Sequence, residues 1–274
     1  MIILGINAYH ADSSAAIFQD GKLMVAAEEE RFRRIKHWAG FPSFAIQFCL
    51  KEAGVTLEEV DYISIGRDTK AKFWNKVLFM LKGIGKKNSL FFDRLSNSKK
   101  IVSVEKELAN LGRVPLNIIK SKIKYIEHHR AHLASAFFAS PFEESAILSI
   151  DGSGDFTTTM IAIGRGNKIE VIDSLDFPVS AGLFYTAFTQ YLGFPHYGDE
   201  YKVMGLAPYG KPVYIDEIRK IFKFSDNGLF DWESDYFTSP YEINLSYENN
   251  LPSVSKLYSQ KLEDLFGPAR QNGE

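Results

Sequence analysis

The sequence is poor in cysteine, in net charge and in long apolar runs. Its single cysteine, Cys49, excludes an intrachain disulfide and is typical of a protein of the reducing cytoplasm. Because Cys49 lies in the apolar run 44–50, we interpret it as a core residue and not as a nucleophile. The formal net charge of -2 provides no broad attraction for nucleic acid or an acidic membrane. Residues 1–7 are apolar but too few for a membrane span or signal peptide, so we expect a first strand there.

A repeat is present in the chain. Residues 2–30 and 146–173 each contain an apolar strand that ends in a polar residue, a turn, and two further strands. The polar residues Asn7 and Asp151 are 144 positions apart (151 − 7). A βββ meander used twice is typical of actin-like ATPases, in which two ribonuclease-H-like halves face a nucleotide cleft. The alternative is two unrelated meanders, because hairpins with glycine turns are common.

The two halves are expected to differ in completeness. Residues 1–145 predict a first ribonuclease-H-like half with a basic insertion at about 69–123. Residues 146–274 predict the start of a second half, followed from 223 by a polar, aromatic segment with few strand signals. The expected fold is therefore α/β and actin-like with an incomplete second half, and we expect a fragment or a tail that continues elsewhere. The expected elements are helices at 41–53, 129–139, 181–192 and 215–222, strands at 60–65 and 124–127, and a glycine-rich loop at 196–210.

Three histidines cluster in the segment EHHRAH at 127–132. His128 and His132 are four positions apart, which on a helix places their imidazoles on one face, about 5–6 Å apart at Cβ. Asp151, at the end of the following strand, is the natural third ligand. Two imidazoles and a carboxylate suit Fe(II), Zn or Mn. His129 points about 100° away and is expected to hydrogen-bond a neighbour or a substrate. Ordinary surface or core histidines are the alternative.

Four separated segments resemble the NodU/CmcH family of O-carbamoyltransferases, in the same order. They are AYHADSSAAIFQDGKLMVAAEEERFRRIKHWAGFP, HHRAHLASAFFASPF, ILSIDGSGD and YGDEYKVMGLAPYG. The resemblance covers nearly the whole chain and is weakest in the insertion and in 223–274. It implies a Kae1-like first domain with the actin-like fold. The family's Gly-Gly loop, its final Asp metal ligand and its YrdC-like second domain are absent from this sequence.

The resemblance implies a two-step reaction. The YrdC-like domain makes carbamoyl adenylate from carbamoyl phosphate and ATP, and the Kae1-like domain passes the carbamoyl group to a hydroxyl of a small-molecule acceptor. A metal stabilises charge on the attacked carbonyl, and a histidine takes the hydroxyl proton. The expected partners are these substrates and the YrdC-like domain, without nucleic acid or membrane. The acceptor's identity and a homodimer stay open.

The resemblance also gives roles to residues near the first turn. His10 matches the family's histidine near the acceptor and is expected to be the general base, with Asp12 orienting it or binding the acceptor. Lys36 and His37 are expected to contact substrate. Taken alone, the first residues fit a surface turn with local capping, and the run 31–37 fits a solvated basic face.

Two segments are candidates for nucleotide binding. Gly152, Ser153 and Gly154 would wrap a phosphate with backbone N–H groups, or form a simple hairpin turn. In YKVMGLAPYG, Lys202 would meet phosphate charge and Gly205 would permit close approach of the ligand. By itself, that second segment is typical of a turn between helices.

Two other functions compete with carbamoyl transfer to a small molecule. One is a tRNA threonylcarbamoyl transferase of the Kae1/TsaD type, which His10-Ala11-Asp12 and the AEEERF segment disfavour. The other is a sugar kinase or ATP-binding module on the actin-like frame. A kinase has no need of the HxxxH pair, so a bound transition metal discriminates between these functions.

Overall fold

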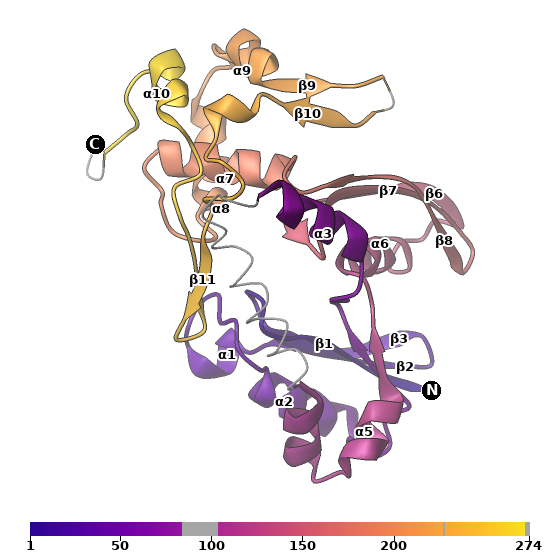
Figure 1. The fold of residues 1–274 in the computed structure, drawn as a ribbon. Helices are drawn as coiled ribbons and strands as arrows, with labels where there is room; N and C mark the ends of the chain where they lie inside the picture. The colour runs from indigo at the N-terminus through magenta and orange to yellow at the C-terminus, as the bar shows by residue number, and fades with distance from the viewer. Residues whose placement is uncertain (84–103, 227, 272–274) are drawn as a thin grey trace. The chain divides into compact units, whose positions relative to one another are not determined.

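The computed structural model describes residues 1–83, 104–226 and 228–271 (Figure 1). They divide into two compact units. The first unit holds residues 1–70, 104–128 and 245–253, and the second holds the others. The division falls between residues 128 and 129, inside the continuous helix α6 (His128–Phe137). In the described ranges, no helix has the length and apolarity needed to cross a membrane.

A five-stranded sheet in the order β3-β2-β1-β4-β5 forms the first unit. The first three strands make an antiparallel meander, whereas β4 and β5 run parallel to β1. This is the strand arrangement expected of a ribonuclease-H-like half. The strands are β1 (Ile2–Asn7), β2 (Ser14–Gln19), β3 (Lys22–Glu28), β4 (Tyr62–Ile65) and β5 (Ile123–Tyr125).

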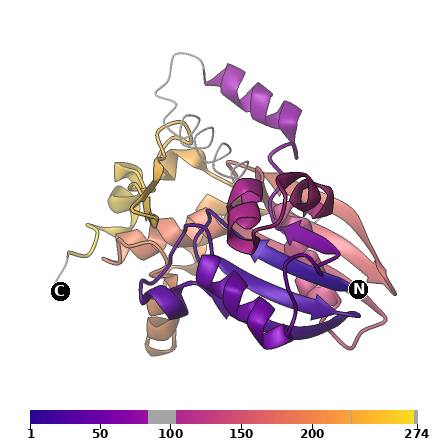
Figure 2. The same cartoon turned by 90° about the horizontal axis from the view of Figure 1, so that it is seen from below.

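Alternate residues of these strands build the first core. Leu4 and Ile63, on neighbouring parallel strands, are fully buried, as the period of two in a strand requires. Helix α2 (Ser43–Ala53) covers the sheet and buries Cys49, so the interpretation of this thiol as a core residue is confirmed. Figure 2 shows α2 in front of the sheet when the molecule is seen from below. The helix ends at Gly54, whose φ of 66° lies in the left-handed region that glycine favours.

Part of the predicted basic insertion belongs to this same core. Residues 104–112 are helical, and α5 (Leu116–Lys122) follows them. Val104, Leu108 and Ile119 have no exposed surface and pack with the side chains of the sheet. This half of the insertion is therefore a structural layer of the first unit.

The other end of the predicted insertion carries α3 (Phe73–Lys82), which belongs to the second unit. Phe79 stacks on Tyr241 with ring centroids 4.7 Å apart and meets Phe156 edge-on. Trp74 is 73% exposed on another side of the helix. Residues 84–103, which fall within the predicted insertion, lie outside the described residues.

The second unit contains a three-stranded antiparallel sheet in the order β6-β7-β8, which repeats the meander of the first unit. Helix α6 packs on this sheet through Leu133 and Phe137, which share a core with Ile147 and Met160. In the described part of the chain, no strand pairs parallel to β6. The predicted second meander is confirmed, while the incompleteness of the second half stays a prediction. The strands are β6 (Glu144–Gly154), β7 (Thr157–Arg165) and β8 (Lys168–Asp176).

Helices and short hairpins follow the second meander. Phe184 and Phe188 of helix α7 contact Phe222, Phe237 and Phe266, which joins the C-terminal elements into one aromatic core. The segment from about residue 223, which carries few strand signals in its sequence, forms two short hairpins. The elements are α7 (Ala181–Tyr191), α8 (Glu200–Leu206), η1 (Ala207–Tyr209), α9 (Ile215–Ile221), β9 (Phe222–Phe224), β10 (Phe230–Trp232), η2 (Ser234–Tyr236), β11 (Leu245–Glu248), β12 (Leu251–Val254) and α10 (Gln260–Phe266).

The hairpin of β11 and β12 lies mostly in the first unit, although the residues before and after it lie in the second. Its tip residues Asn249 and Asn250 both have positive φ, as a tight hairpin turn requires. The carbonyl oxygen of Asn250 accepts a hydrogen bond of 2.8 Å from the backbone N–H of Ala39. The first unit is therefore completed by a segment that is distant in sequence.

Candidate metal and transfer site

Helix α6 presents two of the clustered histidines together. His128 is its first residue, and His132 follows one turn later. His129, Leu133 and Phe137 repeat at the same spacing and form the buried stripe of this helix. Because residues 128 and 132 each precede a residue of that stripe, their side chains lie about 100° from it, toward the edge of the packed face.

His129 is fully buried and bonds to two protein neighbours. Its Nε2 lies 3.0 Å from the carbonyl oxygen of Thr157, which only accepts, so Nε2 carries the proton. Its Nδ1, 2.8 Å from Ser149 Oγ, then accepts from that hydroxyl. Of the two roles expected for His129, the structure favours the bond to neighbours over a substrate contact. This residue fixes α6 on the sheet and so orients His128 and His132.

Asp151, the candidate carboxylate ligand, lies on β6. The pairing of β6 with β7 shifts register there, between Ile150 and Gly154. The Oδ1 of Asp151 accepts a 2.6 Å hydrogen bond from the backbone N–H of Gly152. Its side chain is 38% exposed. The bulge therefore leaves the Asp151 carboxylate at the end of the regular ladder, with its other oxygen directed to α6.

The start of helix α7 holds the backbone of Asp151. Ser180, the residue that caps α7, places its Oγ within hydrogen-bond distance of the carbonyl oxygens of Asp151 and Gly152, at 3.0 and 2.7 Å. Gly182 lies close to the backbone of Asp151 and Gly152. A β-carbon on it would be 2.5 Å from the Gly152 nitrogen and 2.6 Å from the Asp151 carbonyl carbon. Only a residue without a side chain permits this approach.

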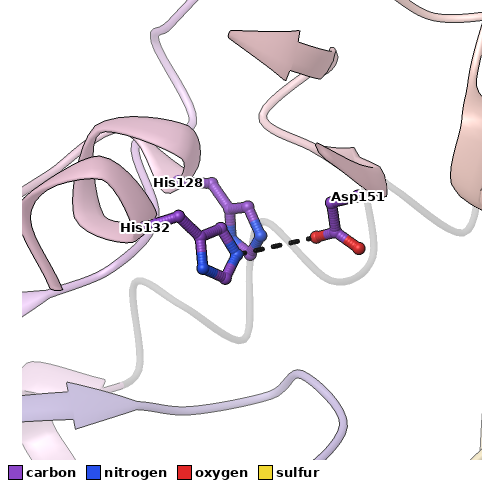
Figure 3. A group of neighbouring side chains, drawn as sticks. All are labelled: His128, His132 and Asp151. Atoms are coloured by element: carbon purple, nitrogen blue, oxygen red, sulfur yellow. Dashed lines mark ion pairs between the residues drawn. The ribbon is translucent and has the colours of Figure 1, made fainter. Parts of the chain in front are cut away.

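Figure 3 shows the side chains of His128, His132 and Asp151 as neighbours. Each offers one ligand atom, and these atoms all lie within 4.8 Å of one another. His132 Nε2 is 3.7 Å from Asp151 Oδ2. A metal bonded to each at about 2.1 Å needs ligand atoms about 3–3.5 Å apart, so closing the side chains by about 1 Å suffices. Two imidazoles and one carboxylate on one side of an ion, with open positions, suit Fe(II), Zn or Mn. The donor set fits such a metal, while binding itself stays a prediction.

The first turn of the chain brings together three of the other candidates. His10 lies beside His128, with ring centroids 5.6 Å apart. Asp12 does not meet His10: its Oδ1 lies 2.9 Å from His37 Nδ1. Asn7 closes the turn, since its side-chain amide donates to the carbonyl oxygens of residues 11 and 12. The contact with His37 does not support orientation of His10 by Asp12, and the binding role of Asp12 stays a prediction.

The basic run 31–37 is divided between packing and solvent. Arg33 lies over the ring of Trp38 at 4.4 Å, and its Nε donates to the buried carboxylate of Glu29 at 2.8 Å. Glu29 in turn accepts the backbone N–H of Ala45 in the first turn of α2. Lys36 is exposed. The run is therefore partly a structural clamp, while Arg31, Arg34 and Lys36 are exposed.

The first nucleotide candidates lie within a strand and not in a free turn. Gly152, Ser153 and Gly154 form the last residues of β6, where the bulge interrupts the ladder. The Oγ of Ser153 is buried and has no hydrogen-bond partner among the described residues. A buried hydroxyl without a partner is costly, so a ligand acceptor beside it would be stabilising.

The second nucleotide segment is a helix, so the predicted loop at 196–210 is wrong in part. Residues 200–206 form α8, which contains both Lys202 and Gly205. Lys202 Nζ lies 2.6 Å from the Asp199 carboxylate, and this hydrogen bond raises the pKa of Lys202 above its ordinary value. No atom lies within 4 Å of a β-carbon built on Gly205. The glycine and the nearby proline suggested a loop, but the helix ends at Leu206, before Pro208, which lies in the following turn η1.

The comparison with protein families matches the sequence of the chain to one family. The family described as carbamoyltransferase N-terminus covers residues 2–272. The chain belongs to this family. The resemblance predicted from the four sequence segments is thereby confirmed.

Two relatives of this carbamoyltransferase-family chain are longer than it is. It is 39% identical over 277 residues to the uncharacterized protein sll1178 of Synechocystis, across 99% of this chain and 43% of that protein. It is 37% identical over 229 residues to the nodulation protein NolNO of Sinorhizobium fredii, across 81% of this chain and 31% of that protein. The chain spans less than half the length of each. Among solved structures it is similar to YeaZ from Pseudomonas aeruginosa, with 15% identity, a TM-score of 0.34, and coverage of 66% of this chain and 68% of that one.

Three residues at this family member's site were missed by sequence reasoning. Ser180 and Gly182 hold Asp151, and Arg67 lines a pocket with His10. Ser180 carried a usable signal, because a serine before an apolar helical run predicts an N-cap. Arg67 and Gly182 carried none, since their importance comes from contacts that are distant in sequence.

Proposed function

We propose that this chain carries the transfer site of an O-carbamoyltransferase, at which a carbamoyl group passes from carbamoyl adenylate to a hydroxyl of a small-molecule acceptor. Membership of the family supports carbamoyl transfer in general. The observation that carries the finer proposal is the convergence of His128, His132 and Asp151. Neither the kinase nor the simple ATP-binding alternative calls for such a ligand set.

The three ligand candidates fit a divalent transition metal, with Fe(II) as the first choice and Zn or Mn as others. When bound, this metal supplies the positive charge that stabilises an oxyanion developing on the carbamoyl carbon. His132 and Asp151 have side chains that are 49% and 38% exposed, which leaves room for a substrate oxygen. His129 holds the helix that carries the two imidazoles in register with the sheet.

His10 is the proposed general base. Its Nδ1 lies 3.3 Å from the carbonyl oxygen of Ala11, which only accepts, so Nδ1 carries the proton and Nε2 carries the lone pair. The acceptor's hydroxyl oxygen forms a bond to the carbamoyl carbon, and the bond from that carbon to the adenylate phosphate oxygen breaks. AMP leaves, and the hydroxyl proton goes to His10 Nε2.

Other residues have proposed roles in binding. The Asp12 carboxylate, 49% exposed and steadied by His37, suits a hydrogen bond from a hydroxyl of the acceptor. Lys36 is an exposed cation in the same segment of the chain. The backbone of 152–154, with the buried Ser153 hydroxyl, and α8, with Lys202 and Gly205, are proposed to contact the nucleotide. The adenylate itself is proposed to be made from carbamoyl phosphate and ATP by a YrdC-like domain.

The test uses the full-length protein, carbamoyl phosphate, ATP and a panel of hydroxylated acceptors, with products detected by mass spectrometry. His10→Ala is expected to keep its metal and to form carbamoyl adenylate, while transfer falls by roughly 10²–10⁴-fold. His196→Ala, at an exposed histidine outside these groups, is the matched control and is expected to transfer normally. Transfer by His10→Ala at the wild-type rate would remove the base assignment. Loss of both steps would make the role of His10 structural.

A further inference from the structure

Three parallel strands deliver residues to one small pocket in the first unit. The strands β1, β4 and β5 run in the same direction, so their carboxyl ends lie at one edge of the sheet. The chain beyond these ends supplies His10, Arg67 and His128, which line the pocket together with apolar residues of the strands. In open α/β sheets, ligands bind outside the carboxyl ends of parallel strands.

Backbone hydrogen bonds fix this edge. The N–H of Arg67 donates to the carbonyl oxygen of Ile65 at 2.8 Å, and the N–H of Ile126 donates to the same oxygen at 2.8 Å. The N–H of Gly66 reaches the carbonyl oxygen of Ile6 at 3.4 Å. The pocket is therefore formed by backbone that is tied to the sheet, and the backbone of Arg67, which lines it, is part of that backbone.

Arg67 brings a positive charge to the pocket that no acidic side chain balances in the described part of the chain. Among the other described arginines of this unit, Arg33 Nε lies 2.8 Å from Glu29 and Arg31 lies 3.4 Å from Glu28. Arg34 and Arg113 are exposed to solvent, whereas Arg67 is not. Arg67 is half-buried, yet none of the ion pairs or side-chain hydrogen bonds of the described residues includes its guanidinium. A partly desolvated cation is stabilised by an anion beside it.

We propose that Arg67 binds the phosphate group of the carbamoyl donor in the pocket that it shares with His10 and His128. This inference rests on the proposed function, because it names the part of the donor that the pocket holds. The planar guanidinium offers two parallel N–H groups that match two oxygens of a phosphate. The pocket has room for about one water-sized group, so it takes a single oxygen of the phosphate, and the rest of the donor lies outside it. Arg67 thus places the carbamoyl carbon near the base and the metal ligand that line the same pocket.

The experiment measures equilibrium binding of AMP and of inorganic phosphate to the full-length protein by calorimetry. Four proteins are compared: wild type, Arg67→Gln, Arg67→Lys and Arg165→Gln. Arg165 is the matched control, because it is 60% exposed and pairs with Glu144 at 2.7 Å on another sheet. Arg67→Gln is expected to weaken AMP binding at one site by roughly 10–100-fold. Arg67→Lys keeps the charge but loses the forked donors, so an intermediate loss is expected.

The outcomes separate this inference from the proposed function. Identical AMP isotherms for wild type, Arg67→Gln and Arg67→Lys overturn the inference, and so does a loss confined to inorganic phosphate, which would assign the pocket to a free anion. Should Arg67→Gln not fold, Arg67→Lys decides alone. The kinetic arm compares transfer: Arg67→Gln is expected to raise the KM for carbamoyl adenylate and to leave the KM for the acceptor unchanged. If the wild type transfers no carbamoyl group, the proposed function fails, while the isotherms still judge the pocket.

Discussion

Replacing Gly182 by alanine tests whether helix α7 holds Asp151, the proposed carboxylate ligand of the metal, in position. The new β-carbon would lie 2.5 Å from the Gly152 nitrogen, 2.6 Å from the Asp151 carbonyl carbon and 2.8 Å from the Asp151 carbonyl oxygen. All three atoms belong to the backbone, so no side-chain rotation relieves the contact. Ordinary contacts between carbon atoms are about 3.5–4.0 Å, so the helix and the strand must separate by about 1 Å.

The contact in Gly182→Ala is expected to change two quantities, the free energy of unfolding and the affinity for metal. Forcing an extra methyl group into a close contact costs about 1–3 kcal/mol, and the higher helix propensity of alanine offsets about 1 kcal/mol. The free energy of unfolding is therefore expected to fall by about 0–2 kcal/mol. The larger effect falls on the metal, because a shift of about 1 Å at a group that supports a ligand costs roughly 10–100-fold in affinity.

The assay is metal binding by the full-length Gly182→Ala protein, titrated with Fe(II), Zn or Mn and paired with urea unfolding. Gly210→Ala is the matched control: a β-carbon there would meet only the Ala207 carbonyl oxygen, at an ordinary 3.5 Å. The control is expected to bind metal as the wild type does. Wild-type metal affinity in Gly182→Ala would refute the reasoning that α7 fixes Asp151.

Three further predictions concern the ligands, the thiol and the chain itself. His128→Ala and His132→Ala are each expected to lose most of the metal in elemental analysis, and unchanged content in both would remove the ligand assignment. Burial raises the pKa of Cys49 to about 11, so the fold favours the protonated thiol. This contribution to the free energy of unfolding is full below the ordinary pKa of a thiol and is lost as the pH rises toward 11. At pH 8, alkylation of Cys49 is expected to be much slower in the native protein than in the protein unfolded in urea. Equal rates would contradict the burial of the thiol. The 274-residue chain alone is expected to form no carbamoyl adenylate from carbamoyl phosphate and ATP, and its detection by mass spectrometry would assign adenylate formation to this chain.

The sequence predicted the parts of the fold that depend on local patterns. The repeated meanders were visible because strand alternation, strand ends and glycine turns all recur at one spacing. The spacing of His128 and His132 placed them on one helical face, and the next strand led to Asp151. These inferences needed only the periods of helix and strand.

Contacts between distant segments could not be predicted in the same way. The pairing of Asp12 with His37 depends on two residues with left-handed backbone, at φ of 59° and 57°, that no simple pattern reveals. The burial of Val104 and Leu108 turned a region predicted as an insertion into part of the core. The strands of the C-terminal hairpins have only three or four residues, which is too few for a clear alternation.

The hairpin of β11 and β12 has a consequence for the synthesis of the protein. The first unit takes residues up to 128 from the early chain but also needs residues 245–253, which include the partner of Ala39. Between residues 128 and 250 the ribosome adds 122 residues (250 − 128), which takes roughly 6–25 s at about 5–20 residues per second. During that interval the backbone N–H of Ala39 lacks its native acceptor. The first unit therefore reaches its final form only after most of the second has been made, so the two units mature together and not in sequence order.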